Sequence, residues 1–210
     1  MESLKKKGIF IAFEGIDGSG KSTQLRMLSD RLKATGLRCY TTREPTDSPI
    51  GSLIHQIMTG RMSADNRVLA SLFAADRADH LLNDTDGICS KIDDGITVLT
   101  DRYYFSSYAY HSVDMDMDWV ISANSLCADI LRPSITVFLD LPVAMALERI
   151  RRDRFQTELF EKEERLIQVR DNYFAAFERL KNVENIAIID AAGSAGEISD
   201  SIWRAVAHLF

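Results

Sequence analysis

The sequence predicts an α/β fold with three αβα layers, in which helices cover both faces of a five-stranded parallel sheet. Short apolar runs rich in Ile, Val and Phe recur along the 210 residues, and segments with helical spacing separate them. This alternation is typical of parallel sheets with right-handed crossover connections. Because the runs are nearly continuous in apolar residues, we expect the strands to be covered on both faces.

Five apolar runs are expected to form the strands. They are Ile9–Phe13, Arg38–Thr42, Ile96–Thr100, Ile135–Leu139 and Ile186–Ile189. Four of the runs are followed by an acidic residue, namely Glu14, Asp101, Asp140 and Asp190. In open parallel sheets the ligand crevice lies beyond the carboxyl ends of the strands, so a residue in this place can serve a binding site. For Asp140 and Asp190 we favour a simpler role, either strand termination or capping of the next helix.

Four further segments show helical spacing. Their apolar residues are Leu25, Leu28 and Leu32, then Leu69, Phe73 and Leu81, then Ile167, Phe174 and Phe177, and finally Ile198 to Leu209. No long linker, internal repeat or low-complexity tract interrupts the pattern. We therefore expect residues 1–210 to form a single domain.

Composition narrows the classes of partner. Hydrophobic residues make up 46% of the chain, enough for a sizeable core, and the net charge of −6 argues against a long nucleic acid as partner. No apolar stretch approaches the roughly 20 residues of a membrane span, so no membrane is expected. The three cysteines, Cys39, Cys89 and Cys127, lack Cys-x-x-Cys spacing, which disfavours disulfides and zinc and favours a reducing cytoplasm.

A glycine-rich segment between the first strand and the first helix carries the chemistry. It reads Gly15-Ile16-Asp17-Gly18-Ser19-Gly20-Lys21-Ser22-Thr23 and satisfies G-x-x-x-x-G-K-[ST], the P-loop that holds nucleoside triphosphates. Backbone N–H groups of the loop converge on phosphate oxygens, and the helix N-terminus adds its positive dipole end. Lys21 is expected to reach the β- and γ-phosphates, and the Ser22 hydroxyl to bind Mg²⁺. The glycine spacing does not fit the dinucleotide motif G-x-G-x-x-G.

Three classes of protein share this loop: kinases of small acceptors, GTPase switches and ATPase modules. The sequence contains no Asn-Lys-x-Asp segment of the kind that GTPases use to bind guanine. An ATPase motor would normally be larger or need partner domains. Chain length thus favours a small-acceptor kinase.

Four motifs in order resemble the thymidylate kinase family, which belongs to the P-loop nucleoside-monophosphate kinases. They are the loop Glu14 to Gln24, then Thr42-Arg43-Glu44-Pro45, then Leu72-Phe73-Ala74-Ala75-Asp76-Arg77-Ala78, and Asp101-Arg102-Tyr103 through Tyr110, which matches D-R-Y-x-x-S-x-x-A-Y. The resemblance implies transfer of the ATP γ-phosphate to dTMP, which gives dTDP and ADP in dTTP biosynthesis. It also implies Mg²⁺ as cofactor and a homodimer.

Cationic residues near strand ends are the candidates for the transfer itself. Phosphoryl transfer depends mainly on positioning and charge neutralisation, so Lys21 and Arg102 are assigned to catalysis. Arg43 and Arg102 follow strand ends, where their guanidinium groups can hold the acceptor phosphate. Asp101 is placed to associate with Mg²⁺, together with Ser22.

The nucleoside of dTMP is assigned to residues in the motifs. Phe73 and Arg77 are four residues apart, so a helix places a stacking ring and a carbonyl-binding cation on one face. By resemblance, Asp17 contacts the sugar 3′-hydroxyl, and the Tyr110 ring excludes a 2′-hydroxyl. The family motifs add Pro45, Ser106 and Ser107 to the dTMP site.

An arginine-rich segment completes the resemblance. Residues 149–160 correspond to the short lid that closes over ATP in the family. Within it Arg149 matches the arginine that packs on adenine, and Arg151, Arg152 and Arg154 are candidates for catalysis. His111 stands where the family usually has Gln. Two alternatives stay open: a nucleoside-monophosphate kinase that also accepts dUMP, and a nucleotide-binding regulatory module without turnover.

Overall fold

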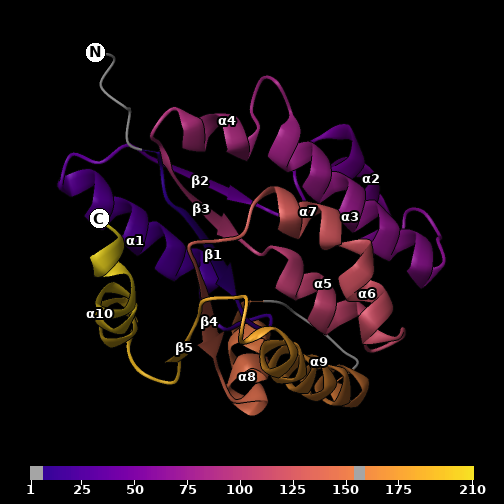
Figure 1. Ribbon diagram of the computed structural model, residues 1–210. Helices are drawn as coiled ribbons and strands as arrows, with labels where there is room; N and C mark the ends of the chain where they lie inside the picture. Colours follow the sequence, from indigo (N-terminus) through magenta and orange to yellow (C-terminus); the bar gives the residue numbers. More distant parts are fainter. Residues whose placement is uncertain (1–6, 154–158) are drawn as a thin grey trace.

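A computed structural model describes residues 7–153 and 159–210, with the side chains of residues 151–162 left out. Five parallel strands form one sheet in the order β2-β3-β1-β4-β5, which confirms the predicted fold class (Figure 1). The strands are β1 (Phe10–Glu14), β2 (Cys39–Arg43), β3 (Thr97–Asp101), β4 (Ile135–Asp140) and β5 (Ile186–Asp190). Each lies within one residue of its expected bounds, and the acidic residue expected after a run is instead the last residue of the strand.

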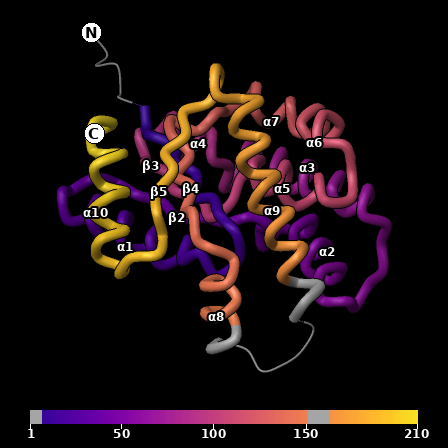
Figure 2. The backbone as a smooth tube through the Cα atoms, turned by 90° about the horizontal axis from the view of Figure 1, so that it is seen from below, coloured from indigo at the N-terminus to yellow at the C-terminus, as the bar shows by residue number. Residues whose placement is uncertain are grey.

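Helices pack on both faces of the sheet. They are α1 (Lys21–Ala34), α2 (Pro49–Met58), α3 (Asn66–Leu82), α4 (Ile88–Asp93), α5 (Tyr104–His111), α6 (Met117–Ala123), α7 (Ser125–Ile130), α8 (Val143–Asp153), α9 (Leu159–Leu180) and α10 (Ala195–Val206), followed by the 3₁₀ turn η1 (Ala207–Leu209). In Figures 1 and 2, α1 and α10 cover one face, whereas α4, α5 and α9 lie on the other, with α2, α3, α6 and α7 beside them. No helix in the described ranges is long and apolar enough to cross a membrane.

The central strands are buried and the edge strands are not. Every residue of β1 is buried, but β2 exposes Thr41 and Arg43, and Ile188 of β5 is 52% exposed. The expectation that every strand is covered on both faces is therefore wrong for β2 and β5. These strands stand at the sheet edges, where each has a neighbouring strand on one side only.

Helix α9 turns the expected residues Phe174 and Phe177 towards the core, but not Ile167. Leu166, Val169, Tyr173 and Phe177 are buried, whereas Ile167, expected on the apolar stripe, is 44% exposed. Among the residues of α9 whose burial is described, 163–180, Leu166 rather than Ile167 therefore belongs to the buried stripe. Apolar spacing identifies a helix, but which turn faces the core depends on the partner, here α5.

The strand order opens a crevice at the carboxyl end of β1. Strand β1 lies between β3 and β4, with Phe13 opposite Asp101 and Glu14 opposite Phe138. After β1 the chain enters α1 on one face, and after β4 it reaches α9 on the other face. Ligands of open α/β sheets bind at such a switch point, and the glycine-rich loop begins there.

The buried face of α9 can be tested with two neighbouring residues. We expect Leu166→Ala to lower the free energy of unfolding by about 2–5 kcal/mol, because it removes a buried side chain from the core. Ile167→Ala is the matched control on the same helix turn and should change it by about 0.5 kcal/mol or less. Urea unfolding of both variants measures the difference. Equal losses would mean that both side chains are buried.

Candidate active site

The loop between β1 and α1 requires glycine for steric reasons. Gly15 has φ of +146°, and a Cβ there would lie 2.7 Å from Ser19 Oγ and 2.8 Å from the Leu139 carbonyl oxygen. Gly18 has φ of +80°, and its Cβ would lie 2.7 Å from the Ala146 carbonyl oxygen. Larger residues would strain the backbone and clash with it at both positions. The loop thus approaches the start of α8 as closely as glycine permits.

Lys21 begins α1 and turns its side chain back into the loop. Its Nζ donates hydrogen bonds to the carbonyl oxygens of Gly15 and Ile16, both at 3.1 Å. Burial, followed by the positive charge of Arg102, lowers the pKa of Lys21 to about 8. Ser19 Oγ is buried in the same loop and has no hydrogen-bond partner among the described residues. These are polar groups that an anion between them would satisfy.

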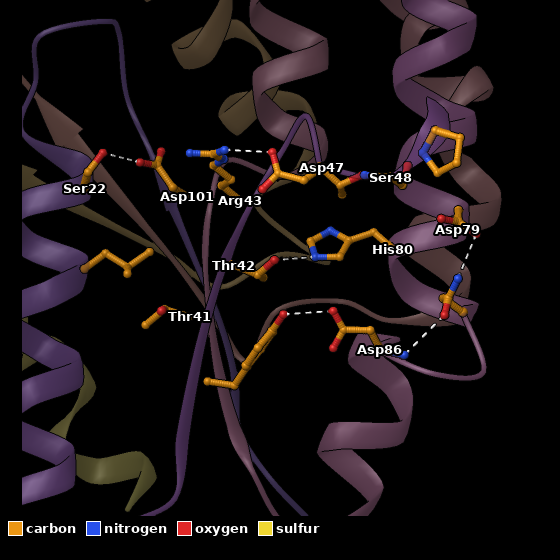
Figure 3. A pocket seen from close by; sticks show the side chains of 15 residues that line it. Ser22, Thr41, Thr42, Arg43, Asp47, Ser48, Asp79, His80, Asp86 and Asp101 are labelled. Carbon is orange, nitrogen blue, oxygen red and sulfur yellow. Dashed lines mark hydrogen bonds and ion pairs between the residues drawn. The ribbon is translucent and has the colours of Figure 1, made fainter. Parts of the chain in front are cut away.

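Ser22 and Asp101 face each other across the end of the sheet. The Ser22 hydroxyl donates to Asp101 Oδ2 at 2.6 Å (Figure 3). A hydroxyl and a carboxylate are hard oxygen ligands, the kind that Mg²⁺ takes. The structure thus brings the two expected metal ligands together. Within the described ranges no group of three or more His, Cys, Asp or Glu residues is arranged to hold a metal by itself.

Arg102 follows β3 with a backbone conformation that is rare outside glycine. Its φ is +76°, and two hydrogen bonds hold this turn. The Arg102 N–H donates to the Phe13 carbonyl oxygen at 2.9 Å, and Thr100 Oγ1 donates to the Arg102 carbonyl oxygen at 2.9 Å. Such conformations persist only where the surroundings enforce them, and they gather at functional sites.

The side chain of Arg102 connects four expected site residues. Nη2 donates to Asp17 Oδ1 at 2.6 Å and to the Tyr110 hydroxyl at 3.2 Å, and Nη1 donates to Ser106 Oγ at 2.9 Å. Nη1 also lies 3.4 Å from the Gly15 carbonyl oxygen, in the phosphate-binding loop. Although desolvation opposes it, the charges of Arg102 and Lys21 lower the pKa of Asp17, which is therefore ionised at neutral pH.

Tyr110 closes this cluster from α5. Its hydroxyl accepts a hydrogen bond from the Asp17 backbone N–H at 3.2 Å, and its ring centre lies 4.8 Å from the Arg102 guanidinium carbon. Burial raises the pKa of Tyr110, so the phenol is neutral. The ring is therefore fixed between the loop and the arginine.

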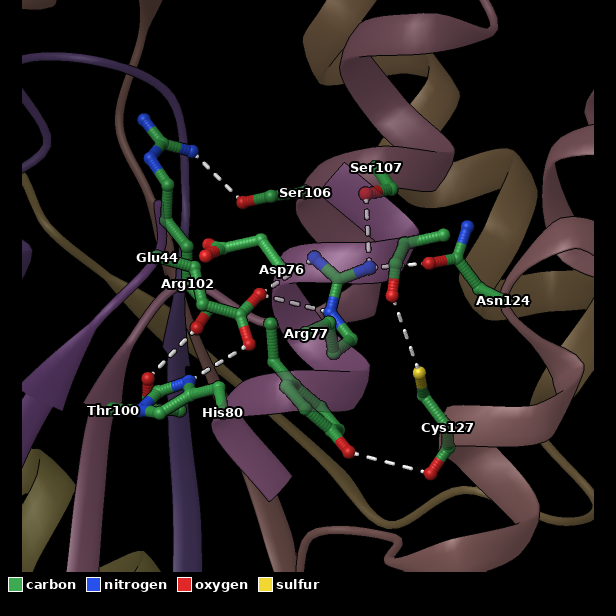
Figure 4. Close-up of polar contacts among 12 residues, drawn as sticks. Glu44, Asp76, Arg77, His80, Thr100, Arg102, Ser106, Ser107, Asn124 and Cys127 are labelled. Carbon is green, nitrogen blue, oxygen red and sulfur yellow. Dashed lines mark hydrogen bonds and ion pairs between the residues drawn. The ribbon is translucent and has the colours of Figure 1, made fainter. Parts of the chain in front are cut away.

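Arg77 is buried and bound on two sides. Its Nε donates to Glu44 Oε2 at 2.8 Å, and its Nη1 donates to Ser107 Oγ at 3.1 Å and to Asn124 Oδ1 (Figure 4). His80 Nδ1 lies 3.2 Å from the other Glu44 oxygen. Hence the cation assigned to the base is set deep between α3, α5 and the loop after β2.

Phe73 lies one helical turn before Arg77 and is half-buried. Its ring contacts the ring of His111, with centroids 5.2 Å apart and planes inclined by 56°. Burial, followed by the charge of Arg77, lowers the pKa of His111 to about 4, so the imidazole is neutral at pH 7. His111 is thus a second ring at the expected base-stacking position.

The loop after β2 is held by Asp76, a buried residue of α3. The carboxylate accepts from Thr46 N at 2.8 Å and Oγ1 at 2.6 Å, and from Ser48 Oγ at 3.1 Å. Pro45 precedes Thr46 and is thereby fixed beside α3. Arg43 instead points outward: its side chain is 62% exposed and pairs with Asp47.

A groove of about 890 Å³ runs from Ser22, Asp101 and Arg43 along β2 towards Tyr40 and Asp86 (Figure 3). Its upper end coincides with the expected metal ligands. Its lower end is lined by residues to which the sequence assigns no role. The two arginines expected at the acceptor phosphate therefore lie apart. Arg43 lines the groove, whereas Arg102 contacts the glycine-rich loop.

The arginine-rich segment is described only in part. Arg149 Nη2 donates to the Ala191 carbonyl oxygen at 3.1 Å, and the side chain passes over Gly20. Arg151 and Arg152 lie in the last turn of α8, but their side chains are outside the description, and Arg154 is outside the described residues. The expected lid over residues 149–160 is therefore described only at its start and end.

Sequence reasoning missed the residues that hold others in place. Glu14, Glu44 and Asp76 stand inside the recognised motifs and are buried, but no role was assigned to them. Each is an acidic residue next to apolar residues or inside a recognised motif, and this pattern could have indicated a buried structural role. Asn124 and Tyr173 lie outside the quoted motifs, and nothing near them in sequence marks them.

Comparison with known proteins gives one family. Residues 13–202 match the family described as thymidylate kinase. A probable thymidylate kinase of Pyrococcus horikoshii is 36% identical over 208 residues, covering 96% of this chain and 97% of its own. A probable thymidylate kinase of Pyrobaculum calidifontis is 37% identical, with 96% and 99% covered. A thymidylate kinase of Afipia carboxidovorans is 34% identical, with 96% and 90% covered.

The buried pair of Glu44 and Arg77 supports a stability prediction. We expect Glu44→Ala to lower the free energy of unfolding by about 3–5 kcal/mol, because it leaves a buried guanidinium without its counter-charge. Asp47→Ala removes an exposed partner of Arg43 from the same loop and should cost about 1 kcal/mol or less. Denaturant unfolding compares the two. A loss in Glu44→Ala no larger than the control would show that solvent reaches Arg77.

Proposed function

Because the chain belongs to the thymidylate kinase family, it phosphorylates dTMP to dTDP in dTTP synthesis, and we propose that Mg-ATP donates the phosphate at the site around Lys21 and Arg102. One observation carries the proposal. Arg102, the cation assigned to the acceptor, lies 3.4 Å from the carbonyl oxygen of Gly15, in the loop assigned to the donor. A phosphate bound to Arg102 and a phosphate bound to the N–H groups of this loop would adjoin each other, as transfer between them requires.

The donor side uses the loop Gly15–Thr23. Its backbone N–H groups and the N-terminus of α1 cradle the phosphates. Lys21 is already buried beside them and supplies the charge that neutralises the β- and γ-phosphates. Arg149 passes over Gly20 and is assigned to the adenine.

Ser22 and Asp101 are assigned to Mg²⁺. Mg²⁺ usually binds one or two protein oxygens and completes its shell with phosphate oxygens and water, which fits a site with two adjacent oxygen ligands. When bound, the ion neutralises charge on the phosphates of ATP. Asp101 at the end of β3 and Ser22 at the end of the loop would hold it.

The acceptor side surrounds Arg102. Arg102 and Ser106 are assigned to the dTMP phosphate, Asp17 to the sugar 3′-hydroxyl and Tyr110 to the face of the sugar. In the transfer, an acceptor phosphate oxygen forms a bond to the γ-phosphorus as the bond from that phosphorus to the ADP oxygen breaks. Arg43 is also assigned to the acceptor phosphate, and its exposed guanidinium presently pairs with Asp47 through Nη2.

The base of dTMP is assigned to Phe73, Pro45, Arg77 and Ser107. Phe73 stacks on the pyrimidine, with Pro45 at its edge. Arg77 is assigned to a ring carbonyl through Nη1, which would exchange one of its present acceptors, Ser107 or Asn124, for the carbonyl oxygen, and Ser107 is assigned beside it. Glu44, which accepts from Nε of Arg77, would keep the guanidinium in its orientation when the base binds.

The proposal also includes the lid arginines and the assembly. Arg151, Arg152 and Arg154 are assigned to charge stabilisation during transfer, as the family resemblance implies. A homodimer follows from the same resemblance. A cytoplasmic location fits the three free thiols, Cys39, Cys89 and Cys127.

The acceptor range tests this function directly. We expect ADP formation from Mg-ATP with dTMP, weaker turnover with dUMP, and little with ribonucleoside or purine monophosphates. Coupled detection of ADP across this panel measures it. Strong turnover with purines would reject the assignment of Phe73 and Arg77 to a pyrimidine, and absence of turnover with every acceptor would favour a regulatory module.

Lys21 gives a pH prediction. Its pKa in the free protein is about 8, and the charged form binds phosphate, so kcat/KM for Mg-ATP should fall as the pH rises through about 8. Bound phosphates favour the charged amine, so kcat should stay level to higher pH. Lys21→Arg keeps its charge over this range, and its remaining kcat/KM should lose the basic limb. A wild-type profile that stays flat to about pH 9.5 would show that Lys21 keeps its charge above pH 8 in the free protein, and a basic limb that persists in Lys21→Arg would assign the limb to another group.

A further inference from the structure

Glu14 is a carboxylate in the centre of the molecule. It is the last residue of β1, it is fully buried, and four donors surround it. Oε1 accepts from the backbone N–H groups of Tyr103 at 2.8 Å and Ser106 at 3.0 Å. Oε2 accepts from Ser106 Oγ at 2.6 Å and from the Tyr173 hydroxyl at 2.8 Å. Elements β1, α5 and α9 thus meet at one side chain.

A buried carboxylate is costly to keep. Burial raises the pKa of Glu14, against the effect of its hydrogen bonds and of Arg102. An apolar residue would fill the same core position at lower cost. The other contacts of its four donors therefore indicate a role beyond packing.

Two of these donors also contact Arg102. Its Nη1 donates to Ser106 Oγ at 2.9 Å and lies 3.5 Å from the Tyr173 hydroxyl oxygen (Figure 4 draws the first contact). The two hydroxyl oxygens also lie 2.9 Å apart, and when each hydroxyl gives its single proton to Glu14, both oxygens keep lone pairs that can accept from the guanidinium. Nη1 is thereby held by residues of α5 and α9, and Nη2 lies beside Asp17.

The tyrosine that takes part is itself rigid. Tyr173 is fully buried, and its ring centre lies 4.8 Å from that of Phe138 and 5.9 Å from that of Phe177. Its hydroxyl is thus fixed by the packing of α9 against β4. The arrangement around Arg102 therefore depends on three elements distant in sequence.

We propose that Glu14 is a positioning residue, which orients Arg102 for the acceptor phosphate through the hydroxyls of Ser106 and Tyr173. The inference rests on the role of Arg102 in the proposed function. Glu14 itself touches neither substrate in this arrangement. It sets the direction in which the two hydroxyls point.

Glu14→Gln should break this arrangement with little change in shape. Two backbone N–H groups face the Oε1 position, so the amide oxygen has to occupy it. The amide NH₂ then faces the two hydroxyls and donates to them. Each hydroxyl must turn its own proton elsewhere, and Nη1 of Arg102 loses an acceptor or meets a donor.

The test separates the phosphate from the rest of dTMP. We measure Kd for thymidine and for dTMP by calorimetry without ATP. The Kd of thymidine divided by the Kd of dTMP gives the contribution of the phosphate to affinity. In Glu14→Gln this ratio should fall at least about fivefold, as for a weakened charge-assisted hydrogen bond, with thymidine affinity within about threefold of wild type. A merely structural loss would weaken both ligands alike and leave the ratio unchanged.

Glu184→Gln is the matched control. Glu184 is also a buried carboxylate that accepts from a tyrosine, Tyr104, at 2.8 Å, but it lies away from Arg102 at the loop before β5. Its variant should lose stability without a change in the ratio. Should Glu14→Gln fail to fold, Tyr173→Phe removes one of the two hydroxyls and should lower the ratio by at least about twofold.

Arg102→Ala distinguishes the acceptor role of Arg102 from the positioning role of Glu14. If Arg102→Ala leaves the ratio at the wild-type value, the acceptor role of Arg102 in the proposed function is wrong. If Arg102→Ala lowers the ratio and both Glu14→Gln and Tyr173→Phe keep it, the proposed function stands and the role of Glu14 is overturned. A fall of the ratio in all three, with the Glu184 control unchanged, supports the positioning role.

Discussion

The contact of Arg102 with the carboxyl end of β1 is the interaction on which the rest of the site depends. Arg102 is attached there twice, by its backbone N–H to Phe13 and by its side chain to the loop after Glu14. A second cation, Lys21, is buried nearby, and the repulsion between them helps lower the pKa of Lys21. Glu14, Asp17 and Asp101 offset that repulsion. The site is thus a set of balanced charges, ready for the additional negative charge of phosphates.

Two buried glutamates restrain arginines in the same way, at the ends of the two strands that flank β3. Glu14 ends β1 and is linked to Arg102 through hydroxyls, and Glu44 follows β2 and binds Arg77 directly. In each case a buried carboxylate restrains a long, flexible guanidinium, so less conformational entropy is lost when a ligand binds. The sheet supplies the rigidity, because both carboxylates stand at strand ends whose register is set by β3.

The strands and the glycine-rich loop could be predicted from the sequence, but most side-chain contacts between distant elements could not. Strand bounds came within one residue because apolar runs report burial directly, and the glycine-rich loop was evident because its steric demands require glycine at fixed spacing. Ile167 was misjudged because the spacing of a helix does not tell which neighbour it packs on. The partners of Arg77 and Arg102 were also out of reach: Asn124 and Tyr173 lie 47 and 71 residues away, and pairing over such distances follows from topology alone.

The net charge of −6 is compatible with the binding of phosphate-bearing nucleotides, because the two electrostatic effects act over different distances. Exposed acidic side chains set the field beyond the surface, which salt screens over about 8 Å at physiological ionic strength, and this field disfavours a long polyanion. Lys21 and Arg102 act at hydrogen-bond distance, where low dielectric surroundings strengthen each contact. A small nucleotide in the crevice would lie within reach of these cations, whereas an extended polyanion would also lie in the field of the net negative chain. The net charge therefore argues against a long nucleic acid as partner but not against a small nucleotide.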